Sequence, residues 1–360
     1  MKWRRETPAS LIVLALTLLQ AAPMDSTVHA DAQGGSVQVA VSIGSLSLLV
    51  SAAGGEYAST VELIPQGMDP HEFSITPEAV RRASEASLVV VTGHIGWEDK
   101  LVEEVAERRG RPRGEVGLNL LEDLRGNLTL LELPLGGGAS GGANLHGFWL
   151  YPDNAKVIVE AVASKLSRVD PGHAEYYRRN SMSFSSRVEL LKDMLRSVSE
   201  AHSLSGRSIV AGSPAEQYVA AALNLETAVI LGGEEGEARP NSLSQAYDGL
   251  AGGRYAMILV SDLASKQPVY ASIEELSVET GAPIATVRIL SFESFPDYFV
   301  LMAYNAGQVS GVRRANPRGT PAGGGILWPI IAFTAGVIAL VEALILWRNR
   351  LWTTRWRPKG

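Results

Sequence analysis

The sequence predicts an α/β protein with two lobes, each with a parallel β-sheet flanked by helices, joined by one long rigid helix. Short apolar runs alternate with amphipathic stretches in two separate parts of the chain, which is typical of parallel sheets covered by helices. Between these parts lies a stretch of about 30 residues with the periodicity of a single helix. The 360 residues suffice for two domains of ordinary size once the ends are set aside.

The composition excludes several classes of protein. Hydrophobic residues make up 46% and charged residues 19%, which excludes a disordered chain and leaves room for membrane segments. The formal net charge is −6 and no basic stripe is present, so nucleic acid is not an expected partner. The absence of cysteine excludes disulfides, thiolate ligands, a catalytic thiol and the lipid-modified N-terminal cysteine of many exported proteins.

Residues 1–30 have the pattern of a removed signal peptide. A basic start is followed by the apolar run 11–19 and by small residues near position 30, where a signal peptidase would cut. An uncleaved anchor is the alternative, although the run is shorter than the roughly 20 residues of a spanning helix. The part that follows is therefore expected to be exported.

The C-terminal part predicts a membrane anchor. Residues 326–347 are almost uninterrupted apolar sequence, long enough as a helix to cross a bilayer. The tail 348–360 is basic and holds no acid, so the positive-inside rule places it in the cytoplasm. Residues 309–325 are rich in Gly, Pro and Arg and are expected to form a flexible linker. We therefore expect a single transmembrane helix with the lobes outside the cell.

The first lobe is expected to span residues 31–169. Its short apolar runs are typical of buried strands, and amphipathic stretches lie between them. The expected strands are 37–43, 59–64 and 87–92, and the expected helices are 77–84, 97–108 and one opened by Pro152 and Asp153.

A connecting helix is expected over residues 170–203, where Asp170 and Pro171 open a helical pattern. Its apolar positions fall on one face: Tyr177, Phe184, Val188, Leu191, Leu195 and Val198. The second lobe is expected over residues 204–308. Its expected strands are 208–211, 227–231, 256–260 and 284–287, and its expected helices are 214–223, 243–250, 273–280 and 298–308.

Polar residues follow several strands at the end of the sheet where ligands bind in such folds. His71 and His94 each follow an expected strand, and His146 precedes the helix opened by Pro152. Neutral imidazole is the commonest protein ligand for zinc and its neighbours, so these residues predict a metal site. A structural role is the alternative for any one of them.

Two long motifs carry a resemblance to a known family. The runs GMDPHEFSITPEAVRRASEASLVVVTG and HGFWLYPDNAKVIVEAVASKLSRVDPGHAEYY, with the helix after them, resemble the zinc- and manganese-type solute-binding proteins of ABC transporters, cluster A-I. The resemblance covers about residues 37–308. It implies two lobes joined by one backbone helix, a divalent cation held between them by three histidines and a carboxylate, and delivery to a permease in the membrane.

The resemblance assigns some ligands and leaves others open. His71 matches the first ligand and His146 the second, with one extra residue before the tryptophan. The third histidine is replaced by Ser213, and only Glu293 stands where the final carboxylate is expected. His94, Glu216 or a water molecule could complete the site.

The expected function is capture of a divalent metal, zinc or manganese, by a membrane-anchored monomer that serves an ABC permease. The alternative is a family member that lost the metal and acts as an adhesion or scaffold module or binds another solute, for which Ser213 is the evidence. A metallohydrolase is the third possibility, but no acid or base can be placed by spacing, so an enzyme is not expected.

Overall fold

Two parallel sheets organise the computed structural model, which describes residues 36–65, 67–134, 142–233, 236–290 and 294–312. The first sheet has the strand order β2-β1-β3-β4 and the second β6-β5-β7-β8. All pairs in both sheets are parallel. The predicted pair of parallel-sheet lobes is confirmed.

The N-terminal lobe contains strands β1 to β4, helices α2 to α7 and three 3-10 turns. Its strands are β1 (Val37–Val41), β2 (Ala58–Glu62), β3 (Leu88–Val91) and β4 (Gly117–Asn119). Its helices are α2 (Ser45–Gly54), α3 (Pro77–Glu85), α4 (Glu98–Arg109), α5 (Arg113–Val116), α6 (Leu120–Leu124) and α7 (Pro152–Val169). The 3-10 turns are η1 (Gly55–Tyr57), η2 (Arg125–Asn127) and η3 (Phe148–Leu150).

The C-terminal lobe repeats the alternation. Its strands are β5 (Ser208–Ala211), β6 (Glu226–Ile230), β7 (Tyr255–Ser261) and β8 (Ile284–Val287). Its helices are α9 (Glu216–Ala222), α10 (Pro240–Ala251), α11 (Val269–Thr280) and α12 (Tyr298–Gly311), with the 3-10 turn η5 (Ala264–Lys266). Helix α12 ends at Gly311, beyond the expected end at residue 308, so the expected linker begins inside a helix.

Local sequence explains where the helices of the first lobe begin. Thr76 caps α3 by accepting a hydrogen bond from the backbone N–H of Ala79, and Pro77 occupies the first turn. Pro152 likewise occupies the first turn of α7, which has no side-chain cap. Strand β3 is buried along its whole length, as expected for a central strand covered on both faces.

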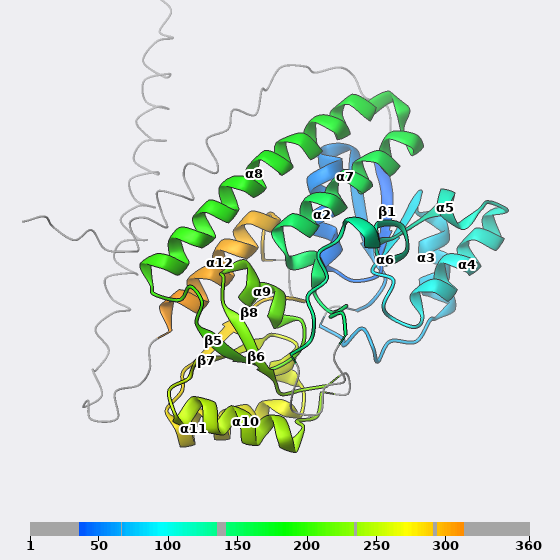
Figure 1. Cartoon of the computed structure of the whole chain (residues 1–360). Coiled ribbons are helices and arrows are strands. Elements are labelled where there is room, and N and C mark those ends of the chain that lie inside the picture. The colour runs from blue at the N-terminus through cyan, green and yellow to red at the C-terminus, as the bar shows by residue number, and fades with distance from the viewer. Residues whose placement is uncertain (1–35, 66, 135–141, 234–235, 291–293, 313–360) are drawn as a thin grey trace, which may run out of the picture. The chain divides into compact units, whose positions relative to one another are not determined.

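The connecting helix is α8 (Ala174–Ala201), preceded by the 3-10 turn η4 (Pro171–His173). Its 28 residues extend over about 42 Å at 1.5 Å per residue. It packs against α2 and α7 of one lobe and against α12 of the other (Figure 1). All six positions of the predicted apolar face are buried.

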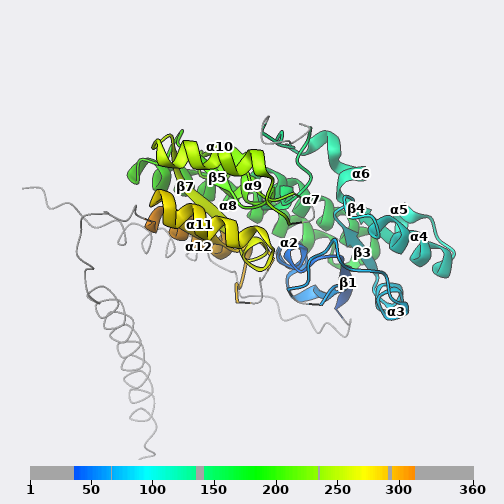
Figure 2. The same ribbon diagram turned by 90° about the horizontal axis from the view of Figure 1, so that it is seen from below.

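One apolar core continues through both lobes. It includes β1 and β3, the buried face of α8, and residues of the second lobe such as Tyr218, Leu259 and Tyr298. A smaller core lies in the second lobe, where α10 and α11 pack together beside the sheet (Figure 2). The lobes are therefore joined by packing as well as by α8.

No helix within the described ranges is long and apolar enough to cross a membrane. The expected signal peptide 1–30, transmembrane helix 326–347 and tail 348–360 lie outside the described residues.

Candidate metal centre

Three imidazoles converge at the carboxyl ends of the first sheet. His71, His94 and His146 each offer a nitrogen, and these nitrogens lie within 4.8 Å of one another. The ring centroids are 5.0 to 5.5 Å apart. Nitrogen ligands around one tetrahedral ion lie about 3.4 Å apart, because each bond is about 2.1 Å long. Small side-chain rotations would therefore let all three rings bind one cation.

His71 lies on the loop between β2 and α3, and its backbone is fixed from two sides. Asp69 accepts a hydrogen bond from the His71 backbone N–H at 3.0 Å, and its other oxygen accepts from Gln267 of the second lobe at 2.9 Å. The carbonyl of Pro70 accepts from the indole N–H of Trp97 at 3.0 Å. These contacts fix the backbone that carries the exposed His71 ring.

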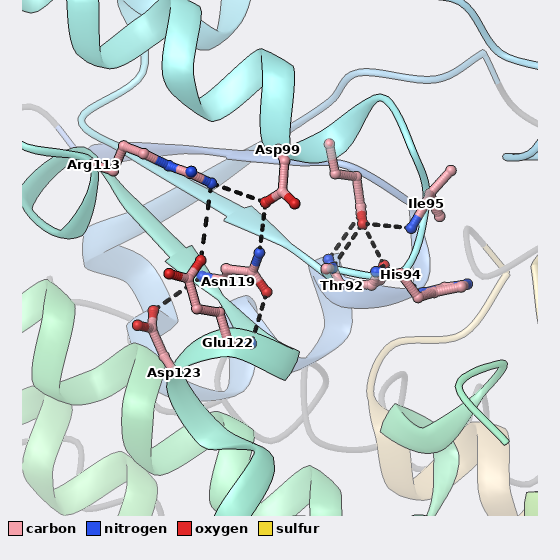
Figure 3. A network of polar contacts seen from close by, with 10 residues as sticks. Thr92, His94, Ile95, Asp99, Arg113, Asn119, Glu122 and Asp123 are labelled. Carbon is pink, nitrogen blue, oxygen red and sulfur yellow. Dashed lines mark hydrogen bonds and ion pairs between the residues drawn. The ribbon is translucent and has the colours of Figure 1, made fainter. Parts of the chain in front are cut away.

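His94 follows β3 and returns toward the strand that it leaves. Gly93 has a φ of +87°, which glycine adopts without strain, and this reverses the chain. The Nδ1 atom of His94 then lies 2.7 Å from the hydroxyl of Thr92 (Figure 3). Burial, together with the neighbouring His146 and His71, lowers the pKa of His94 well below its ordinary value. Its ring is therefore neutral at neutral pH, which is the form that binds metals.

His146 is positioned by Asn144, which is fully buried. The Asn144 side chain accepts from the His146 backbone N–H at 2.9 Å and donates to the Pro214 carbonyl at 2.8 Å and to Gln217 at 2.7 Å. Gly147 has a φ of +80°, and a Cβ there would lie 3.0 Å from Ala215. The second lobe thus supports the loop that carries His146.

Glu216 is not brought into this group. The carboxylate of Glu216 is fully buried and accepts hydrogen bonds from the backbone N–H groups of Ser213 and Ser261, which ties the ends of β5 and β7 together. Burial raises its pKa to about 7, although these hydrogen bonds act in the opposite direction. Ser213 is 4% exposed, and Glu293 lies outside the described residues. No carboxylate among the described residues joins the three histidines in a metal-binding group.

The arrangement can hold a divalent cation. Three imidazole nitrogen donors suit zinc and neighbouring ions better than they suit hard ions such as magnesium or calcium. Asn144, Thr92 and Glu98 were not predicted from the sequence, although Asn144 lies two residues from His146 and Thr92 lies six residues from Glu98. An Asp or Asn two residues before a histidine was the available local signal, because Asp69 and Asn144 each accept from the backbone N–H of the histidine that follows.

Comparisons with known proteins add a family. A family model described as "ZnuA: Zinc-uptake complex component A periplasmic" matches residues 39–311. The manganese ABC transporter substrate-binding lipoprotein PsaA of Streptococcus mitis is 23% identical over 314 residues, covering 84% of this chain and 97% of that protein. The metal ABC transporter substrate-binding lipoprotein ScbA of Streptococcus cristatus is 24% identical over 268 residues, covering 71% and 82%.

Solved structures share the fold. The crystal structure of ZnuA superposes with a TM-score of 0.62 at 22% identity, covering 77% of this chain and 98% of that one. The structure of the solute-binding protein FpvC from Pseudomonas aeruginosa in complex with Mn2+ has a TM-score of 0.59 at 22% identity, covering 77% and 97%. Two lobes joined by one long helix are thus an architecture common to these proteins.

Proposed function

Because the chain belongs to the ZnuA family of zinc-uptake components, we propose that it captures a divalent metal ion outside the cytoplasm and delivers it to an ABC permease in the membrane. The metal ion is the cargo, and the protein is a binding protein and not an enzyme. Relatives named for manganese and a family named for zinc leave these two ions as the leading candidates.

The proposed ligands are His71, His94 and His146. The observation that carries this assignment is their convergence, with nitrogen atoms within 4.8 Å of one another. His94 would supply the third imidazole that Ser213 cannot supply, and it would do so from the first lobe. A fourth position would be filled by water or by a residue outside the described ranges, among which Glu293 remains the proposed carboxylate.

We also propose how the protein is held at the membrane. Residues 1–30 would be removed as a signal peptide, and the helix 326–347 would anchor the chain with the tail 348–360 in the cytoplasm. The relatives are named as lipoproteins, whereas this chain has no cysteine to carry a lipid. The lobes 31–169 and 204–308, joined by 170–203, would then act as a monomer tethered by the linker 309–325.

Elemental analysis of the purified full chain tests the ligands. The wild type should carry about one zinc or manganese ion per chain, whereas His71→Ala, His94→Ala and His146→Ala should each lower the affinity by at least about 100-fold, because loss of a ligand exceeds the 10- to 100-fold cost of losing a supporting contact. His202→Ala, the same change at the end of α8, is the matched control. Equal metal content in the wild type and the three cluster variants would overturn the assignment.

A second candidate function is favoured by Ser213 and Glu216. A serine replaces the third histidine that the family resemblance implies, and the nearby carboxylate is turned into the protein. A lineage that lost the metal could act as an adhesion or scaffold module or bind another solute. Titration calorimetry and thermal melting with zinc, manganese and other divalent ions separate the two functions. A ligand at 100 times its dissociation constant stabilises the fold by about 2.7 kcal/mol, so the absence of both heat and a melting shift would favour this candidate.

A further inference from the structure

We infer that Glu98, acting through the hydroxyl of Thr92, fixes His94 in the tautomer that leaves Nε2 unprotonated and available to a cation. Glu98 is thus a positioning residue of the metal centre. The inference deepens the proposed function and rests on it for the role of His94 as a ligand. It concerns this chain's own third imidazole, which stands on the loop after β3.

Glu98 lies at the start of α4 beneath that loop and is fully buried. One carboxylate oxygen accepts from the backbone N–H of Thr92 at 2.8 Å. The other accepts from the backbone N–H groups of Gly93 at 2.7 Å and Ile95 at 3.2 Å. These donors surround a negative charge with charge-assisted hydrogen bonds and fix the path of the loop. Figure 3 shows Thr92, His94 and Ile95 around the carboxylate from which the dashed lines run.

The Thr92 hydroxyl is the fourth donor to Glu98. Its oxygen lies 2.7 Å from the same carboxylate oxygen, and it also lies 2.7 Å from Nδ1 of His94. A hydroxyl has one proton, and an ionised carboxylate can only accept. That proton therefore points to Glu98, and the contact with His94 must be made by a proton on Nδ1.

A neutral imidazole carries one N–H, so a proton on Nδ1 leaves Nε2 with its lone pair. The Nδ1 N–H of His94 is bonded to the Thr92 hydroxyl. Nε2 is therefore the nitrogen with which His94 can bind a cation together with the other two rings. The centroid of the His94 ring is 5.5 Å from that of His71 and 5.0 Å from that of His146. Outer contacts that fix a ring in this way typically change metal affinity by 10- to 100-fold.

The opposite order of protons would place an N–H where the cation should bind. It would need a proton on Glu98 donated to Thr92, a Thr92 hydroxyl donated to Nδ1, and a proton on Nε2. Three backbone N–H groups already donate to this carboxylate. Protonating it would weaken these hydrogen bonds, because they are stronger when the acceptor is charged. The geometry therefore favours the order in which Nε2 is free.

Nitrogen NMR of the histidine rings in the full chain tests the tautomer without any metal. In chelator-treated wild type above neutral pH, His94 should show a protonated-type Nδ1 and an unprotonated-type Nε2. Thr92→Val keeps the shape but removes the hydroxyl, and it should abolish this preference. Thr92→Ser restores the hydroxyl and should restore the signature. Thr60→Val, the same change on β2, is the control and should leave the His94 signals as they are.

Metal titration of the same proteins completes the test. Thr92→Val should weaken zinc or manganese binding by about 10- to 100-fold, with Thr92→Ser and Thr60→Val close to wild type. Glu98→Gln should weaken binding in the same direction, with thermal melting used to establish that it folds. A wild type that binds no metal would overturn the proposed function. Wild-type binding with a proton on Nε2 of metal-free His94, or a Thr92→Val protein with unchanged tautomer and affinity, would overturn this inference alone.

Discussion

Glu216 shows how far a single side chain can depart from the role that its position predicts. It stands one helical turn after Ser213, close in sequence to the family's third ligand, and was therefore a candidate ligand. Two backbone N–H groups, those of Ser213 and Ser261, draw its carboxylate inward instead. Buried backbone N–H groups after β5 and at the end of β7 need hydrogen-bond acceptors, and this determines the direction of the Glu216 side chain. Spacing along the sequence does not predict such contacts.

The raised pKa of Glu216 predicts a pH-dependent contribution to stability. The folded state holds the proton up to a pKa of about 7, whereas the unfolded chain releases it near 4.5. The contribution is therefore fully present below pH 4.5 and is lost as the pH rises through 7. Relative to Glu216→Gln, the wild-type free energy of unfolding should fall by roughly 3 kcal/mol over this range.

Urea denaturation of both proteins at a series of pH values, with metal chelated, measures this difference. Glutamine cannot accept from both serines, so the variant is expected to be less stable at low pH while showing a smaller decline. Parallel stability curves for the two proteins would contradict the prediction.

Within the candidate site, sequence identified the rings but not their supports. His71 was marked by its motif and His94 by its place after a strand, and both belong to the converging group. Asn144 and Glu98 were not predicted, because their burial and their hydrogen bonds are properties of the folded chain. The proton order at His94 depends on a hydroxyl two residues earlier, which only the folded geometry reveals.

At the scale of elements, apolar runs predicted seven of the eight described strands, and the central strands of both sheets are largely buried. Strand β4 was missed, since Gly117–Asn119 is too short to show a pattern. Helix α2 was also missed, because its apolar residues continue directly from the strand before it. The order in which the strands pair within each sheet depends on tertiary structure, so no single apolar run predicts it.

Tyr218 on α9 links two elements of different lobes and offers a second prediction. Its hydroxyl accepts from the backbone N–H of Leu131 at 3.1 Å and donates to the carbonyl of Asn144 at 2.5 Å. Tyr218→Phe leaves both groups without this partner and should lower the free energy of unfolding by about 1–3 kcal/mol in chemical denaturation. Tyr247→Phe, at a position 42% exposed, is the matched control and should change little. Equal stability of the two variants would show that this contact is not needed.

For the whole molecule, α8 and the shared core predict that the lobes move little on metal binding. The helix packs on both lobes. The hydroxyl of Tyr298, in the second lobe, also donates a hydrogen bond to the carbonyl of Leu150, in the first lobe, at 2.7 Å. Because the chain has no cysteine, the double variant Glu103→Cys and Val278→Cys carries two exposed labelling sites and no other thiol. Spin-label distances measured by pulsed EPR should agree within a few ångströms between the metal-free and metal-loaded protein. A large shift, or a second well-separated population, would contradict the rigid connection.

The three imidazoles that we propose as ligands all come from the same lobe, which bears on how a bound ion would leave. Parting the two lobes would leave these three proposed nitrogen donors together on one lobe. For an ion bound as we propose, unloading would then involve exchange of these ligands for donor atoms of the acceptor. The dissociation rate would then rise with the concentration of a competing chelator, and would not be limited by the speed of a hinge.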